Sequence, residues 1–224
     1  MLCNRTIDYI QKKPMFKKIK QLEFNAVLVQ TDSQESLCRA FLRFQEYYES
    51  PKFKGQIFTI GQIRHWYSIT YGADTYYRDW EGFNFPSYVL EPFKAGLFDP
   101  LTTEEQSLLN LFKYRDDNFY VIGANNHSVT RHELSHALYS YDKKYKIAID
   151  NLCKKHYTSL SKIRKYLLDK GYHKDVLNDE LQAYITDNED SFIIAHLNHN
   201  IINQFNSIQK KYWHVNSSSR KTSN

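Results

Sequence analysis

The feature that most restricts the fold of this chain is the stretch 118–141, where a short apolar run leads directly into a helical pattern. Residues 118–124 carry no charged side chain and are rich in aromatic and branched residues, which is typical of a buried strand. A helix is expected next, because Ser128 and Thr130 can cap its start and neither Gly nor Pro interrupts it through Tyr141. The sequence therefore predicts a buried strand that delivers the chain into a packed helix.

The rest of the N-terminal half predicts few strands and several helices. Alternation and apolar content favour strands at 21–30 and 58–60. Three-and-four spacing predicts helices over 33–50, 63–72 and 102–114, the last with an N-cap signature at Thr102. Periodicity is lost over 73–100, where Gly, Pro and aromatic residues predict a long ordered loop.

The C-terminal half is predicted to be helical throughout, over 144–156, 159–170, 174–186 and 190–213. Residues 216–224 lack periodicity and predict a disordered tail. The fold class is therefore α+β, with a small, mostly antiparallel sheet in one half (about 21–124) and helices in the other (about 127–213). A single domain over 1–215 is expected, with its cleft between the halves.

Composition sets broad limits on the environment and partners of the chain. The net charge of +5 over 224 residues lacks the dense basic stripe of a dedicated nucleic-acid binder. Cys3, Cys38 and Cys153 fit neither a disulfide framework nor a metal knuckle. Since neither a signal peptide nor an apolar membrane span is apparent, a cytoplasmic or otherwise intracellular protein is expected, with signal-less export left open.

The predicted helix after the buried strand contains His132-Glu133-Leu134-Ser135-His136. Histidines four positions apart lie on one helical face, close enough to hold a single metal ion. A catalytic zinc takes three protein ligands and keeps a position for water, whose proton a neighbouring carboxylate can accept. His132 and His136 are thus candidate ligands of one Zn²⁺ and Glu133 a candidate general base, against the alternative that the pattern recurs by chance.

A third ligand is expected on a later helix, and Glu180 is the leading candidate. It shares a helical face with Ala183, whose small side chain permits close approach to the motif helix. The alternatives left open are Asp179, Glu189, His196 and His199.

His132 to His136 on a helix, followed by a helix with Glu180, Ala183 and Tyr184, resembles the zincin metallopeptidases and, among them, the gluzincin branch. Residues 137–143 lack the His-x-x-Gly-x-x-His continuation of the metzincin branch. The resemblance implies peptide hydrolysis, a His132-His136-Glu180 zinc site and a peptide substrate added to the strand at 119–123.

An acyl-transfer site also needs a hydrogen-bond donor for the developing oxyanion. Tyr184 is the first candidate, and His127 and Tyr145 are alternatives. The competing functions are a zinc hydrolase of a non-peptide amide or other small substrate, and a non-catalytic binding protein on the same scaffold. The basic run over 143–174 favours solvated helix faces over nucleic-acid binding, although it can also steer acidic substrates; the oligomeric state is left open.

Overall fold

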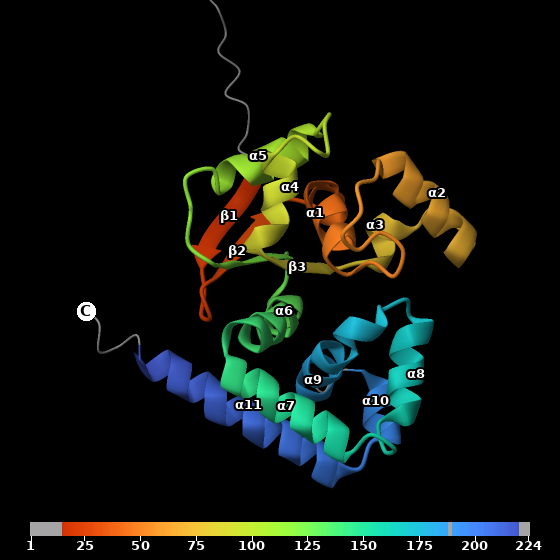
Figure 1. Ribbon diagram of the computed structural model, residues 1–224, viewed down its shortest axis with the longest axis vertical. Coiled ribbons are helices and arrows are strands. Elements are labelled where there is room, and N and C mark those ends of the chain that lie inside the picture. Colours follow the sequence, from red (N-terminus) through yellow and green to blue (C-terminus); the bar gives the residue numbers. More distant parts are fainter. Residues whose placement is uncertain (1–14, 188–189, 220–224) are drawn as a thin grey trace, which may run out of the picture.

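The computed structural model describes residues 15–187 and 190–219, with side chains described up to 213, and its fold is α+β (Figure 1). The strands are β1 (Phe16–Gln21), β2 (Ala26–Thr31), β3 (Gly82–Pro86) and β4 (Tyr120–Ala124). The first helices are α1 (Gln34–Glu49), α2 (Ile60–Tyr71), α3 (Tyr76–Asp79), α4 (Glu91–Lys94) and α5 (Thr103–Leu111). The others are α6 (His127–Tyr141), α7 (Lys143–Lys155), α8 (Ser161–Asp169), α9 (Leu177–Asp187), α10 (Ser191–His196) and α11 (His199–Ser219).

The four strands form one mixed sheet in the order β1-β2-β4-β3. Strand β1 pairs antiparallel with β2, β2 pairs parallel with β4, and β3 pairs antiparallel with β4. Strand β4 is therefore bonded on both sides, and β3 is the sheet edge on its side. The expectation that a substrate strand adds directly to residues 119–123 is wrong, because β2 and β3 already occupy both edges of β4.

Alternating side chains along the strands build a separate core on each face of the sheet. Leu28 and Ile122 pack with α6, α7, α9 and α11, whereas Val27, Val29 and Val121 pack with the aromatic core around α1. Because both faces are buried, the motif helix α6 is fixed against one face while α1 is fixed against the other. Gly123 lets β4 approach the Phe41 ring of α1, since a Cβ atom at this position would overlap that ring.

The helical half, α6 to α11, lies on one side of the sheet and α1 to α5 lie on the other (Figure 1). Helix α6 packs against α9, which brings two distant parts of the chain together. Within the described residues, the helices include none with the length and apolar character needed to cross a membrane.

Several predicted element boundaries are wrong. The strand expected over 21–30 is a hairpin that turns at Phe24 and Asn25, both with positive φ. The turn is hidden in the sequence because the alternation of polar and apolar residues continues through it. The short strand at 58–60 is absent, since Thr59 caps α2 through a capping box with Gln62. Capping at Ser33 and Thr102 begins α1 and α5 close to the predicted positions.

The predicted loop 73–100 contains α3, β3, a 3-10 helix at Ser87–Leu90 and α4. Glycine and proline at the two ends of β3 imitate loop signals, although Phe83 and Phe85 are fully buried. The single helix expected over 190–213 is divided into α10 and α11. Helix α11 extends to Ser219, so the predicted tail is wrong for 216–219, while 220–224 lie outside the described residues.

Candidate metal centre

Helix α6 presents the two motif histidines side by side toward α9. Asn126 caps the helix by accepting from the amide of Val129, which fixes where its first turn begins. The Nε2 atoms of His132 and His136 lie 3.2 Å apart. Glu180 of α9 completes the group, with Oε1 3.8 Å from Nε2 of His136. All three candidate ligand atoms lie within 4.8 Å of one another, so the tertiary structure brings the predicted ligand set together.

Both histidines are held from behind by carboxylates that the sequence did not identify in this role. Nδ1 of His136 lies 2.8 Å from Oδ1 of Asp179, and Nδ1 of His132 contacts Oδ2 of Asp187. A carboxylate only accepts hydrogen bonds, so each Nδ1 carries a proton, and a neutral imidazole held in this way presents the lone pair of its Nε2 atom. This arrangement is the usual support of metal-binding histidines.

Two lone pairs facing each other at 3.2 Å repel unless a proton or a cation lies between them. Two nitrogens bound to one tetrahedral zinc ion at their usual distances are about 3.3 Å apart, so the observed spacing fits such an ion. Oε2 of Glu180 is buried without a hydrogen-bond partner, which is costly for a carboxylate in the absence of a cation. The donor set and its orphaned oxygen therefore fit a divalent metal.

The pKa values of these groups show the accumulation of negative charge. Burial lowers the pKa of His136, but the carboxylates of Asp179 and Glu180 outweigh burial and leave it well above the ordinary value. Burial also lowers the pKa of His132, and the hydrogen bond to Asp187 brings it above the usual range. Burial raises the pKa of Glu180 to about 7, against the lowering effect of the two histidines.

Glu133 is buried next to the ligand group and takes no part in it. Its Oε2 accepts a hydrogen bond of 2.6 Å from the Asn84 side chain, whose own oxygen accepts from the hydroxyl of Tyr120. Burial raises the pKa of Glu133. Strand β3 passes so close that a Cβ atom at Gly82 would overlap Oε1 of Glu133. Sequence reasoning missed both Asn84 and Gly82, because their strand resembles a loop.

A cavity of about 560 Å³ opens beside this centre and is lined from both halves of the molecule. Its walls include His132, Glu133, His136 and Glu180, together with Tyr184. The ring of Tyr184 packs edge-on against that of His132, with centroids 4.8 Å apart. The Tyr184 hydroxyl lies 2.8 Å from that of Tyr172, and burial raises the pKa of Tyr184 to about 12. A protonated phenol is therefore available at the cavity wall.

The other candidate site residues lie elsewhere. Tyr145 is buried in the core and donates to Gln182, and His127 lines a second cavity behind α6. His196 bonds to the carbonyl of Phe192, away from the cavity, and His199 begins α11. Asp179 supports His136, and Glu189 lies outside the described residues.

Comparison of the chain with protein-family models, with curated proteins and with solved structures found no match. Its function is therefore inferred from its own residues and their geometry.

Proposed function

We propose that the protein is a zinc-dependent peptidase in which His132, His136 and Glu180 hold one Zn²⁺ and Glu133 is the general base. The observation that carries the proposal is the convergence of two Nε2 atoms and a buried carboxylate, each imidazole being supported by its own carboxylate. A structural zinc site would use four protein ligands, whereas this group supplies three and opens into a cavity. This open position favours catalysis.

Zinc bound at this site would lower the pKa of a coordinated water and polarise a substrate carbonyl. Glu133 lies next to the candidate ligands and is held by Asn84, so it would accept a proton from the attacking water and return one to the leaving amine. Because the pKa of Glu133 is raised, it lies closer to neutral pH. A base with such a pKa both accepts and returns a proton efficiently.

Tyr184 supplies the hydrogen-bond donor that the developing oxyanion needs. Its hydroxyl is protonated at neutral pH and its ring is fixed between His132 and Tyr172. A donor of this kind stabilises negative charge that appears only in the transition state.

Strand β3 provides the edge on which a peptide chain can lie. The amide of Asn84 already donates to Oε1 of Gln45 at 2.8 Å, so this side chain occupies the edge at that position. Gly82 lies at the end of the strand that lines the cavity, and it has no side chain to block an approaching backbone. We infer that the substrate backbone pairs near Gly82.

The deciding experiment compares wild type with Glu133→Gln for zinc content and for cleavage of a peptide library. Wild type is expected to contain one zinc per chain and to cleave peptides. Glu133→Gln should retain zinc and the fold, and should lose about 10²- to 10⁴-fold in kcat, the usual contribution of a general base. Loss of zinc from the variant would exclude the base role, since a base is not a ligand.

Two further results separate this function from its competitors. A zinc-loaded wild type that hydrolyses small amides but no peptide would indicate a different zinc hydrolase. A zinc-loaded wild type without hydrolytic activity, whose Glu133→Gln variant behaves identically in binding, would indicate a non-catalytic scaffold.

A further inference from the structure

The cavity beside the metal centre is strongly acidic, although the chain as a whole is not. Eight of its lining side chains are Asp or Glu, while its basic residues other than histidine amount to Lys170 alone. The ammonium of Lys170 lies 3.3 Å from Asp190 and is therefore already paired. The complete chain has a net charge of +5, so this acidity is a local property of the cavity. A low-dielectric cleft of one sign attracts ligands of the opposite sign.

Five of these acids have roles in the metal centre or in the fold that explain their presence. Glu180, Asp187 and Glu133 belong to the metal centre. Asp79 accepts a hydrogen bond of 2.8 Å from the hydroxyl of Tyr67, and Asp190 caps helix α10. None of these five requires a substrate with a positively charged group.

Of the remaining three acids, Asp169 pairs with Lys165 and Glu81 is exposed, whereas Glu49 is buried. Glu49 is the last residue of α1, is 9% exposed and lines the cavity. One of its oxygens accepts from the amide of Gln45, and within the described residues no hydrogen bond or ion pair reaches the other oxygen. Burial and the neighbouring carboxylate of Glu180 raise the pKa of Glu49 well above its usual range, because its ionised form has only a neutral amide partner. An approaching cation favours the ionised form and relieves that cost. The metal group does not include Glu49, so a zinc ion held there would not be bound by this carboxylate.

The same cavity has an aromatic wall formed by Tyr67, Tyr71, Trp80 and Tyr172. The faces of such rings attract ammonium and guanidinium groups. The protein already contains one contact of this kind here, since the ammonium of Lys170 lies 5.0 Å from the ring centre of Tyr184. Charge and aromatic lining thus favour the same class of ligand.

We propose that the substrates of this protein are peptides with a positively charged amine or guanidinium group, which binds in the cavity against Glu49. The inference rests on the proposed peptidase function and names its substrate class. Glu49 acts as a specificity residue: it selects the substrate, whereas Glu133 and the metal ligands perform the chemistry. An acidic peptide is disfavoured because like charges meet in the cleft.

The test uses peptides blocked at both termini that differ at one position, occupied by Lys, by norleucine or by Glu, with that position scanned along the peptide. In wild type, kcat/KM for the best Lys peptide should exceed that for its norleucine counterpart by about 10-fold or more, and the Glu peptide should be poorest. An unblocked norleucine peptide forms a separate arm, which distinguishes an α-amino group from a side chain as the source of the cation.

Glu49→Gln keeps the shape of the side chain and removes its charge, so the Lys-to-norleucine ratio should fall to about 2 or less. Glu81→Gln is the matched control, because Glu81 lines the same cavity but is exposed, and a screened charge contributes little. The ratio should therefore remain near the wild-type value in this control. Zinc content and thermal unfolding establish that both variants are folded.

Equal rates for Lys and norleucine peptides in wild type, or an unchanged ratio in Glu49→Gln, would overturn the inference and leave the peptidase function intact. If Glu49→Gln does not fold, wild type is assayed with Lys and N-acetyl-lysine peptides, and equal rates again overturn it. If no peptide is cleaved, the peptidase function fails. The Kd values of Lys and norleucine peptides for zinc-loaded Glu133→Gln then test the preference for a positive charge. Equal Kd values would exclude that preference.

Discussion

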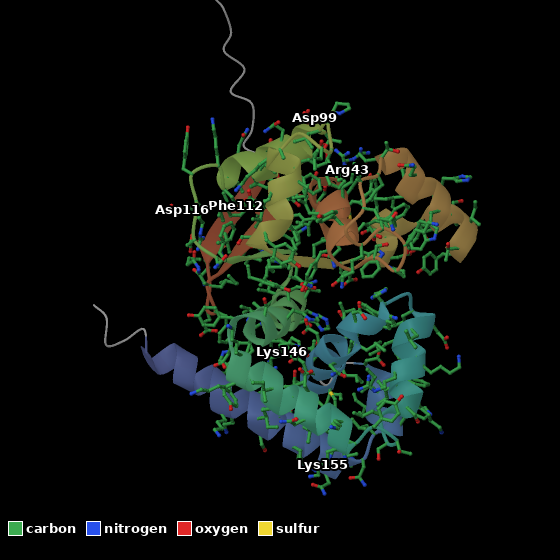
Figure 2. All side chains as sticks on the ribbon, viewed as in Figure 1. Arg43, Asp99, Phe112, Asp116, Lys146 and Lys155 are labelled. Atoms are coloured by element: carbon green, nitrogen blue, oxygen red, sulfur yellow. The ribbon has the colours of Figure 1, made fainter. Side chains whose placement is uncertain are left out.

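Two buried glutamates in this protein have opposite surroundings. Glu105 of α5 forms a bidentate pair with Arg43 of α1, with Nε 2.6 Å from Oε1. The guanidinium also donates to the carbonyl of Phe98 at 2.9 Å, and Glu105 closes the capping box of its own helix. Arg43 lies inside the half that contains α1 to α5 (Figure 2). Glu180 of α9 is equally buried, but one of its oxygens has no partner.

The difference separates a carboxylate that stabilises the fold from a carboxylate that, in our proposal, binds a metal ion. Around Glu105 every charge is compensated by the chain itself, so the pair needs nothing from outside. Around Glu180 negative groups accumulate, and the Nε2 atoms of the two neighbouring histidines face one another at 3.2 Å. An unsatisfied buried carboxylate oxygen beside two histidines in one cavity marks a candidate site for a cation.

The largest expected effect is a loss of folding stability when the ion pair of Glu105 and Arg43 is broken. Glu105→Gln leaves the buried guanidinium of Arg43 without a carboxylate, and breaking such a pair costs about 3–5 kcal/mol. Chemical denaturation should show a fall of this size in the free energy of unfolding, with zinc content unchanged while the protein is folded. A loss below about 1 kcal/mol would mean that the pair does not stabilise the fold.

The matched substitution at the metal centre should behave in the opposite way. Glu180→Gln removes an uncompensated buried carboxylate, so the zinc-free protein should keep or gain stability. Zinc affinity should fall by more than about 100-fold, because even residues that only support a ligand contribute about 10- to 100-fold. Metal-competition titration measures this, and unchanged affinity would assign the third ligand to another residue.

Changing a carboxylate that supports a histidine should have a smaller effect on zinc affinity. Asp187→Asn keeps an oxygen that can accept from Nδ1 of His132 but removes the negative charge. Zinc affinity is expected to fall by about 10- to 100-fold, with the stoichiometry retained at saturating metal. If Asp187→Asn binds zinc as tightly as wild type, the carboxylate does not tune the ligand.

The smallest effect is the pH dependence of stability in the absence of metal. The pKa of Glu180 is raised to about 7 and that of His136 is raised well above its ordinary value, so both groups bind protons more tightly when folded. This stabilisation is complete below the pKa values of the unfolded chain and is lost as pH rises through the folded values. With a chelator present, the free energy of unfolding should therefore fall as the pH rises from about 5 to about 8.

Zinc should reverse this trend, because it binds the deprotonated ligands and stabilises the protein more as pH rises. Denaturation at the two ends of this range, with zinc and with chelator, measures both slopes. A zinc-free protein that becomes more stable with rising pH would contradict the proposed balance of charge at the centre.

Local sequence was sufficient to predict the strand β4 and the helix α6. Residues 120–124 are apolar and residues 127–141 contain no helix breaker, so short-range preferences and the tertiary structure agree. The four-residue spacing of His132 and His136 places them together on any helix. The sequence also predicted the face of Glu180 and Ala183, since both are buried as expected.

Only the tertiary structure decided what surrounds these residues. Strand β3 has glycine and proline at its ends, so its pattern resembles a loop, and pairing with β4 is what makes it a strand. That pairing brings Asn84 to Glu133, and the packing of α9 on α6 brings Asp179 and Asp187 behind the histidines. These contacts join residues far apart in the chain, and no local spacing encodes them. The sequence determined the ligand and base candidates on α6, whereas long-range packing determined their support, the acidic cavity and the position of Glu49.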